Sequence, residues 1–415
     1  MLKFLLILIV LFFFWYKNAK KKKSFICPSS ILLGIYVVSA IFCIPTLYNE
    51  DYLEPFFQSY WWPSFVFLIS LLVLLMPARI YKENAVTQIV LPNKRVLDIM
   101  AFVLIILSVF SILYYSRTVS NIFSMNLGEA RTELYLGTEY VEAGLVNTIA
   151  SVSASLYVFV LLLFFIYCTI PSSKALRVIL LLSSLSEPLH ILAYVGRDGV
   201  VFWFFSFIFL FAFFRPYMEP GSKKFFKRIF IVAASVMLIP FLLITFSRFG
   251  SGGISSAFNS IVNYWGQGYI QGVLFMGIDN PPITHGGSFP LFWEITGFHH
   301  TSTLQGMTQI GEWRSWFFGT IVTSLYLNFG KLGFWLIAIT TLILFFLVMK
   351  KKSTKLLFHQ IIYYILYYQI MSQGIFYFKQ YTRGGNLFII ITLLLVLFFR
   401  LTYNTENAIR INKKS

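Results

Sequence analysis

Long apolar runs follow one another along almost the whole chain, and this pattern leaves few folds open to it. Each run is bounded by charge and is close to the length that crosses a bilayer as a helix. Because 58% of the 415 residues are hydrophobic and 12% are charged, one soluble core could not bury them. The runs lie at about 2–16, 28–48, 63–80, 97–116, 146–170, 175–195, 199–215, 229–247, 331–349, 357–378 and 385–402. The sequence predicts an all-α polytopic membrane protein of about eleven transmembrane helices, or ten if the short first run lies at the interface.

The first run ends, rather than begins, with a basic cluster, Lys17 and Lys20 to Lys23, and no small-residue cleavage site follows. This order predicts a retained membrane anchor instead of a signal peptide. The three cysteines lie in or beside apolar runs without paired spacing. We therefore expect neither a disulfide framework nor a metal site, and no cofactor motif such as a Walker A loop is present.

Basic residues are unevenly divided between the two sides that the runs define. Six intervals hold 24 of the 33 Lys and Arg residues, and the opposite side holds most of the acidic residues. The six intervals are 17–24, 79–97, 171–177, 215–228, 350–355 and 400–415. Because positive charge beside spans is kept inside, we expect these intervals and the C-terminus in the cytoplasm of a bacterial cell. The net charge of +17 is thus interpreted as a topology signal for the lipid bilayer, with no nucleic acid partner.

This sidedness divides the chain into three parts. Residues 1–247 are expected to form helices one to eight, and residues 331–415 the last three helices and a cytoplasmic tail. Between them, residues 248–330 form one large extracytoplasmic segment with short or re-entrant helices. It combines many glycines and aromatic residues with titratable side chains, including His285 and Glu312. Such a long loop is typical of a functional segment.

Arginines on the outer side oppose the topology rule, which makes them the more informative set. A guanidinium presents a planar fork that suits bidentate contact with phosphate, so we expect an outward site for an anionic lipid headgroup. The alternative is a simple pair with a nearby glutamate, which we prefer for Arg131 between Glu129 and Glu133. The outer arginines are Arg117, Arg131, Arg197, Arg248, Arg314 and Arg383.

Two predicted spans carry polar side chains. On one continuous helix, Glu187, His190, Tyr194 and Arg197 would fall within an arc of roughly 80°, which predicts a polar face toward the bundle interior. The alternative is a contact between Glu187 and His190 that only joins helices. In the tenth span, interhelical hydrogen bonds are sufficient to explain Gln369 and Gln373. Lys379, Arg383 and the glycines that follow are placed to close the outward cavity.

Two motifs resemble the Wzy-type oligosaccharide repeat-unit polymerases, the O-antigen polymerase family. One is the turn Gly196-Arg197-Asp198-Gly199 between two apolar spans. The other is the outer segment that starts at Thr284-His285-Gly286-Gly287 and ends in Leu325-Tyr326-Leu327-Asn328-Phe329-Gly330-Lys331-Leu332-Gly333. Asn328 stands where an aspartate is common in that family, so the resemblance carries no acid role to this position. It implies a GT-C-like fold and a glycosyltransferase.

The reaction implied by the resemblance moves an undecaprenyl-diphosphate-linked glycan onto the next lipid-linked repeat unit outside the cytoplasmic membrane. The product would be the O-antigen of lipopolysaccharide, a capsule or an exopolysaccharide. A chain-length regulator and a flippase are the expected protein partners. Fixed arginines would stabilise the leaving diphosphate without a metal or another cofactor; the candidates are Arg197, Arg248, Arg314 and Arg383.

The attacking sugar hydroxyl needs a proton acceptor, and histidine has the most suitable pKa. His300 and His299 are the first candidates, followed by His285, Asp198 and Glu294. Flat apolar faces for sugars are expected from Tyr264, Trp265, Tyr269 and Trp293. For each of these four, the alternative is an interfacial aromatic belt.

Two other functions remain open. An O-antigen ligase uses the same donor with a different acceptor, which these residues do not distinguish. A flippase or other transporter of lipid-linked oligosaccharides would show internal repeats and paired broken helices. The chain has no such repeat, and its single large outer segment favours an enzyme.

Overall fold

A computed structural model gives the fold of most of the chain. It describes residues 1–48, 61–125, 127–135, 140–141, 144–219, 228, 231, 235, 238–239, 241–247, 253–284, 287–297, 309–310, 313–314, 318–349, 353–402 and 408–413. Within these residues, nine helices are long and apolar enough to cross a membrane. They match nine of the expected runs, which confirms a largely helical, multi-pass membrane protein. The run at 229–247 is described only in part, at residues 231, 235, 238–239 and 241–247, and the run at 357–378 forms a helix of 16 residues, Phe358–Gln373.

The chain divides into two compact units, each built from separate stretches of sequence. Unit 1 comprises Met1–Ala85, Phe258–Ser353 and Tyr363–Ile389; unit 2 comprises Val86–Ala257, Thr354–Ile362 and Ile390–Ser415. This division cuts across the three parts expected from the sequence, because residues from before, within and after the outer segment belong to unit 1. Helices pack by their faces and not by their order along the chain, so an apolar run can join either unit.

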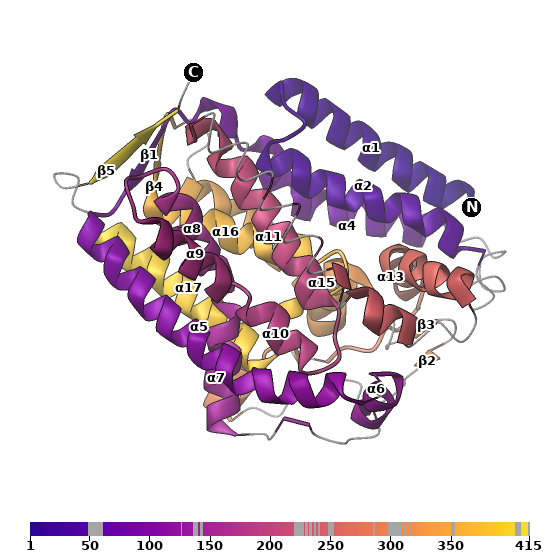
Figure 1. The fold of residues 1–415 in the computed structure, drawn as a ribbon. Helices are drawn as coiled ribbons and strands as arrows, with labels where there is room; N and C mark the ends of the chain where they lie inside the picture. The colour runs from indigo at the N-terminus through magenta and orange to yellow at the C-terminus, as the bar shows by residue number, and fades with distance from the viewer. Residues whose placement is uncertain are drawn as a thin grey trace. The chain divides into compact units, whose positions relative to one another are not determined.

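Unit 1 begins with α1 and α2, which lie side by side (Figure 1). The indole of Trp15 donates to the Ser30 carbonyl at 2.9 Å, and Gly34 leaves room for that ring. The elements of this unit are α1 (Leu2–Lys22), α2 (Pro28–Thr46), α4 (Trp61–Ile80), η2 (Glu83–Ala85), most of α13 (Gly253–Met276), α14 (Pro290–Thr296), β2 (Gln309–Ile310), β3 (Trp313–Arg314), α15 (Thr320–Met349), the later part of α16 (Phe358–Gln373), η5 (Lys379–Tyr381) and the start of α17 (Arg383–Leu401).

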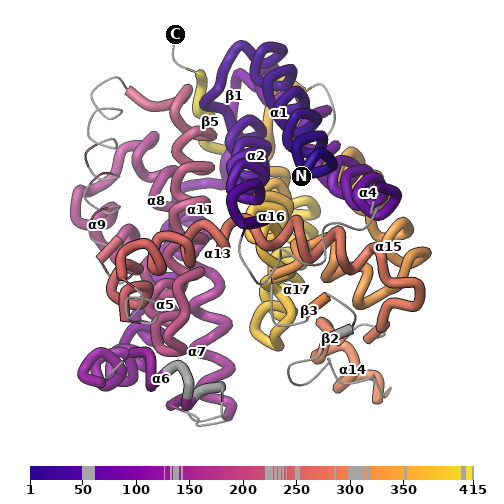
Figure 2. The backbone as a smooth tube through the Cα atoms, turned by 90° about the vertical axis from the view of Figure 1, so that its right-hand side faces the viewer, coloured from indigo at the N-terminus to yellow at the C-terminus, as the bar shows by residue number. Residues whose placement is uncertain are grey.

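Unit 2 contains the remaining helices, among which α5 and α7 lie alongside each other (Figure 2). Two expected spans are each broken into two helices, at Leu156 and at residues 184–185. Its elements are β1 (Gln88–Leu91), α5 (Lys94–Phe123), α6 (Leu127–Tyr135), α7 (Leu145–Ser155), α8 (Tyr157–Tyr167), α9 (Lys174–Ser183), α10 (Ser186–Leu192), α11 (Asp198–Phe214), η3 (Arg215–Tyr217), β4 (Lys355–Leu357) and β5 (Ile409–Asn412), with parts of α13, α16 and α17.

A small sheet in unit 2 was not expected from the sequence. Its strand order is β4-β1-β5, with β4 parallel and β5 antiparallel to β1 (Figure 1). The register pairs Ile89 with Leu356 and with Ile411, and all three side chains are buried. The strands come from or adjoin three of the six basic intervals, so these intervals meet on one side of the unit. That arrangement agrees with the expectation that the three share a side.

The helix α15 begins eleven residues before the expected start at 331. Its first two N–H groups, of Thr320 and Ile321, donate to the carbonyls of Phe376 and Gly374 at 2.9 and 2.7 Å. At Gly330 the backbone has a φ of 67° and a ψ of −174°, which kinks the helix within the glycine-rich signature. A left-handed φ of this kind favours glycine. The signature is therefore a bent helix that enters the membrane-spanning part, and not a loop before it.

Candidate functional site

In unit 1, one buried amide holds Thr284 and Ser288 against α15. The Nδ2 of Asn328 donates to Ser288 Oγ at 2.8 Å and to the Ser324 carbonyl at 2.6 Å. Its Oδ1 accepts from the Ser288 N–H at 2.7 Å and lies 3.3 Å from the Thr284 hydroxyl. The Thr284 N–H also donates to the Leu327 carbonyl at 2.8 Å. Asn328 therefore ties both Thr284 and Ser288 to α15.

These contacts give a physical reason for asparagine at this position. An aspartate could accept the two bonds to Oδ1 but could not donate to Ser324 or Ser288. It would instead place a carboxylate oxygen beside the Ser324 carbonyl oxygen in a buried site, where unpaired polar groups are costly. The structure assigns Asn328 a positioning role.

A second set of amides lies in the connection between α16 and α17. Gln373 Nε2 donates to Gln369 Oε1 at 2.9 Å, and Gln380 Nε2 donates to Gln373 Oε1 at 2.6 Å. Asn386 Nδ2 donates to the carbonyls of Gln380 and Ser288, at 2.6 and 3.1 Å. The bonds that the glutamines make with one another thus run along α16 and into the connection, and do not join two spans. We call Ser288, Asn328, Gln373, Gln380 and Asn386 the amide scaffold.

The amide scaffold leaves two acceptors free. Gln380 Oε1 and Asn386 Oδ1 are buried and have no hydrogen-bond partner among the described residues. Buried carbonyl oxygens are normally paired with a donor, which includes ordered water. Each of the two oxygens can accept a hydrogen bond from an ordered water.

Two of the sequence-predicted site residues meet at the surface of this scaffold. Arg383 Nε donates to Glu294 Oε1 at 2.6 Å, which joins the start of α17 to α14. The side chains remain 62% and 43% exposed. The same two chain segments are also joined underneath by the bond from Asn386 to the Ser288 carbonyl. A carboxylate and a guanidinium are thus held side by side where a ligand can reach both.

Aromatic side chains expected to contact sugars have different environments. Tyr264 and Trp265 are half-buried and pack against Phe376 at ring distances of 4.9 and 5.5 Å. Trp293 is half-buried on α14, one residue from Glu294. These three keep part of their surface open.

Tyr269 is fully buried, and this corrects its expected role in the described structure. Its ring meets Phe67 edge-on at 5.6 Å, and its hydroxyl donates to the Tyr36 carbonyl at 2.9 Å. Both the face and the hydroxyl of Tyr269 are taken up by protein, so it anchors α13 and presents no surface to a sugar. The spacing of aromatic residues on α13 did not reveal which ones point into the core.

Arg314 lies in the two-stranded sheet of β2 and β3, where Gln309 pairs with it across the turn. Its backbone N–H donates to Gln271 Oε1 at 3.0 Å, and the neighbouring Trp313 packs on Phe275 at 5.1 Å. These contacts fix the strand on α13 and leave the Arg314 side chain half-buried.

In unit 2, the turn between α10 and α11 depends on close backbone packing. A Cβ at Gly196 or Gly199 would approach Ile191 side-chain atoms to 2.6 or 2.7 Å, which only glycine avoids. Val195, just before the turn, has a left-handed φ of 51°. The helix α10 therefore ends at Leu192, and the continuous face expected from Glu187 to Arg197 is wrong beyond this point.

Arg197 leaves that face and enters the interior of unit 2, where it is 6% exposed. Its Nη1 donates to Thr245 Oγ1 at 2.8 Å, and its guanidinium carbon lies 5.6 Å from the centre of the Phe241 ring. Asp198 starts the first turn of α11 and is half-buried. A carboxylate is favourable there because the helix N-terminus carries partial positive charge.

Glu187 and His190 form the contact that was the alternative expectation. His190 Nδ1 lies 3.2 Å from Glu187 Oε2, one helical turn away. The His190 ring also packs against the rings of Tyr115 and Tyr194, at 4.7 and 5.6 Å. This buried group joins α5, α10 and the turn that follows.

Several expected residues lie outside the described part of the chain, namely His285, His299, His300, Arg248 and Glu312. Of the described candidates, the structure joins Glu294 with Arg383 in unit 1, and places Arg197 next to Asp198 in unit 2. Within the described ranges, no group of three His, Cys, Asp or Glu side chains could hold a metal ion.

Sequence reasoning missed the residues that support these sites. Ser288, Gln380, Asn386 and Thr245 each bond a site residue or its backbone. For Gln380 and Asn386, the sequence signal was weak. Both are polar amides at the ends of apolar runs, and topology alone already permits polar residues there. Comparisons of the chain with models of protein families, with curated proteins and with solved structures find no match in any of the three.

Proposed function

We propose that this protein polymerises lipid-diphosphate-linked oligosaccharide repeat units on the outer face of the bacterial cytoplasmic membrane. The observation that carries the proposal is the Arg383–Glu294 pair seated on the amide scaffold. The scaffold contains Asn328 of the polymerase-like signature, which bonds Ser288, and the Ser288 carbonyl accepts in turn from Asn386, three residues after Arg383.

Each group in this region has a use in glycosyl transfer. The acceptor hydroxyl attacks the anomeric carbon of the donor glycan, the bond from that carbon to the diphosphate oxygen breaks, and undecaprenyl diphosphate leaves. Arg383 can grip phosphate oxygens as negative charge develops on them. Once phosphate competes for Arg383, Glu294 is released beside it.

The proton of the acceptor hydroxyl must pass to a base. His300 and His299 are our first candidates because histidine titrates near ambient pH. Glu294 is the described alternative in the same unit. Arg314, also in that unit, is proposed as a further phosphate contact, whereas Arg197 is buried inside unit 2 and is not part of this proposal. Tyr264, Trp265 and Trp293 are proposed to stack on sugar rings.

The test uses purified full-length protein in liposomes with lipid-linked single repeat units added. Wild-type protein should yield a ladder of glycan lengths and release undecaprenyl diphosphate. Arg383→Ala and Arg383→Lys should both shorten the ladder, because lysine keeps the charge but loses the fork. Lys20→Ala, which removes an exposed cation of the same unit outside the motifs and the candidate site, is the control and should leave the ladder unchanged.

The same assay separates the alternatives. Movement of intact repeat units across the membrane without any glycosidic bond formed would identify a transporter and refute the proposal. Transfer onto a different acceptor, with no extension of the lipid-linked chain, would identify a ligase. Loss of base catalysis in His300→Ala should lower the rate by about 10²–10⁴, whereas His285→Ala should have a smaller effect.

A further inference from the structure

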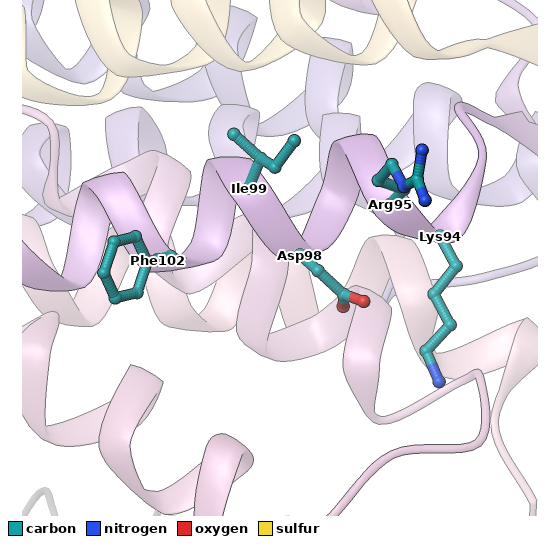
Figure 3. Close-up of a pocket in the computed structure, with 5 residues that line it drawn as sticks. All are labelled: Lys94, Arg95, Asp98, Ile99 and Phe102. Carbon is teal, nitrogen blue, oxygen red and sulfur yellow. The ribbon is translucent and has the colours of Figure 1, made fainter.

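The first turns of α5 line a shallow hollow in unit 2. Its volume is about 540 Å³, and it is bounded by Lys94, Arg95, Asp98, Ile99 and Phe102. Figure 3 shows Arg95 and Ile99 on one side of the helix and Lys94 and Asp98 on the other, with Phe102 a turn further on. Two cations therefore flank the start of an apolar helix face.

Neither cation has a polar partner in the part of the chain that the structure describes. Within the described residues, Lys94 and Arg95 form no ion pair or hydrogen bond through their side chains, and both are exposed. Asp98, whose Oδ1 accepts a hydrogen bond from the Tyr167 hydroxyl at 2.5 Å, offsets one of the two positive charges and leaves the lining of the hollow with a net positive charge. Two adjacent cations in the first turn also oppose the helix dipole. The two positive charges at this position destabilise the isolated helix. A bound anion would offset this unfavourable interaction.

The surface beyond the cations is apolar and also exposed. Ile99 and Phe102 are 58% and 66% exposed, and the exposed face continues through Val103, Ile106, Val109, Phe110 and Leu113. These positions recur at helical spacing and form one stripe along α5. A free phosphate would gain nothing from this stripe. A lipid has both parts, a charged headgroup for the cations and an acyl chain for the stripe.

We propose that the start of α5 binds one anionic phospholipid of the surrounding bilayer. Its phosphate contacts Lys94 and Arg95, and an acyl chain lies over Ile99, Phe102 and the stripe that follows. Basic side chains beside a membrane span attract anionic headgroups and each contributes a favourable electrostatic term. The proposal is independent of the glycosyl transfer proposed above, because none of these residues was assigned to that reaction.

The test measures lipid binding to the full-length, delipidated protein in a zwitterionic detergent. Phosphatidylglycerol and phosphatidylcholine are added separately, and retained lipid is counted by native mass spectrometry. Wild-type protein should retain one phosphatidylglycerol in preference to phosphatidylcholine. The double variant K94Q/R95Q should bind phosphatidylglycerol about thirtyfold more weakly, from the typical contribution of two basic residues near a lipid surface. The variant K94R/R95K should bind as the wild type does.

The matched control is R410Q/K413Q, which removes two exposed cations from β5 and its neighbour. Its affinity for phosphatidylglycerol should lie within about twofold of that of wild type, because exposed charges elsewhere contribute little. Phe102→Ala should weaken binding of the lipid but not its preference for the anionic headgroup. Equal binding of the two lipids by wild type, or unchanged phosphatidylglycerol binding by a folded K94Q/R95Q protein, would overturn the proposal. Displacement of the lipid by millimolar inorganic phosphate would do so too, in favour of a free anion.

Discussion

Two ion pairs in unit 1 have the same chemistry and opposite surroundings. Lys22 Nζ lies 3.2 Å from Glu83 Oε1, with the side chains only 5% and 8% exposed. Arg383 and Glu294 form their pair at 2.6 Å in the open. Burial decides what each pair can do, because a buried charge has no alternative partner, whereas an exposed charge can exchange its partner for water or a ligand.

The buried pair is completed by further hydrogen bonds. Lys22 Nζ also donates to Ser29 Oγ at 2.6 Å and to the Ala78 carbonyl at 2.9 Å. Glu83 accepts from Ser29 Oγ at 2.6 Å and from the Tyr364 hydroxyl at 3.1 Å. The pair thus fastens α1, α2, α4 and α16 together. The exposed pair has no comparable enclosure, which suits a site that must open to substrate.

The largest expected effect comes from removing one partner of the buried pair. Lys22→Met should lower the free energy of unfolding by about 3–5 kcal/mol, because Glu83 is left as an uncompensated buried charge. Thermal unfolding in mild detergent measures this. The double variant K22M/E83Q should recover much of the loss, since neither charge then remains. If the Lys22→Met protein were as stable as wild type, the Lys22–Glu83 pair would have to be in contact with water. The difference between the buried and the exposed pair would then disappear.

The thiol of Cys27 reports on the same region. Burial, together with the nearby Glu83 carboxylate, raises the pKa of Cys27 to about 11. At pH 8 the thiolate fraction, and with it maleimide labelling, should be about a hundredfold below that of a free thiol of ordinary pKa. Because the pKa of Cys27 is higher in the folded state, the thiol's contribution to the free energy of unfolding is fully present below pH 9. It is lost as the pH rises toward 11.

Labelling is measured in a variant with Cys43 and Cys168 replaced by alanine. Lys22→Met should accelerate the maleimide labelling of Cys27, whereas Arg383→Ala should leave the labelling rate unchanged. Equal acceleration by both changes would show that the two pairs open together.

Asn328 offers an intermediate case, a buried polar group without charge. Asn328→Asp should cost about 2 kcal/mol of unfolding free energy, because two donated bonds are lost and an acceptor faces the Ser324 carbonyl. Asn121→Asp at an exposed position of α5 is the control and should change stability by less than about 0.5 kcal/mol. Chemical denaturation followed by circular dichroism gives both values. If the two substitutions cost the same, Asn328 is not what ties Thr284 and Ser288 to α15.

The smallest effect on stability is expected at the exposed pair. Arg383→Ala should change the free energy of unfolding by less than about 1 kcal/mol, since exposed ion pairs contribute little. The same variant should nevertheless shorten the glycan ladder. A loss of stability comparable to that of Lys22→Met would make Arg383 a structural residue, and its loss of activity would then carry no information about catalysis.

The apolar pattern predicted most of the helices because span length and composition are local properties. The run at 199–215, for example, corresponds to α11 at Asp198–Phe214. The start of α15 was misjudged because Lys331 marked a boundary that the helix crosses. Its first turns are stabilised by carbonyls of residues 374 and 376, and such distant contacts leave no local signal.

The candidate site was predictable in part for the same reason. Arg383 stood out because an arginine on the expected outer side opposes the topology rule, and Glu294 was a candidate proton acceptor in the expected outer segment. Their pairing could not be predicted, because 89 positions separate them and the connection depends on Asn386 reaching the Ser288 carbonyl. Tyr269 was misassigned because spacing on α13 gives the side of the helix but not what covers it.

The strands of the three-stranded sheet are translated at widely separated times. The strand β1 is made early, but β4 and β5 follow only after most of the membrane helices have been translated. About 320 residues separate β1 from the end of β5, which at roughly 5–20 residues per second means a wait of tens of seconds. During this time β1 has two open edges, a state in which strands pair with wrong partners. We therefore expect Gln88–Leu91 to be the segment of the nascent chain most prone to wrong strand pairing until β4 and β5 have been made.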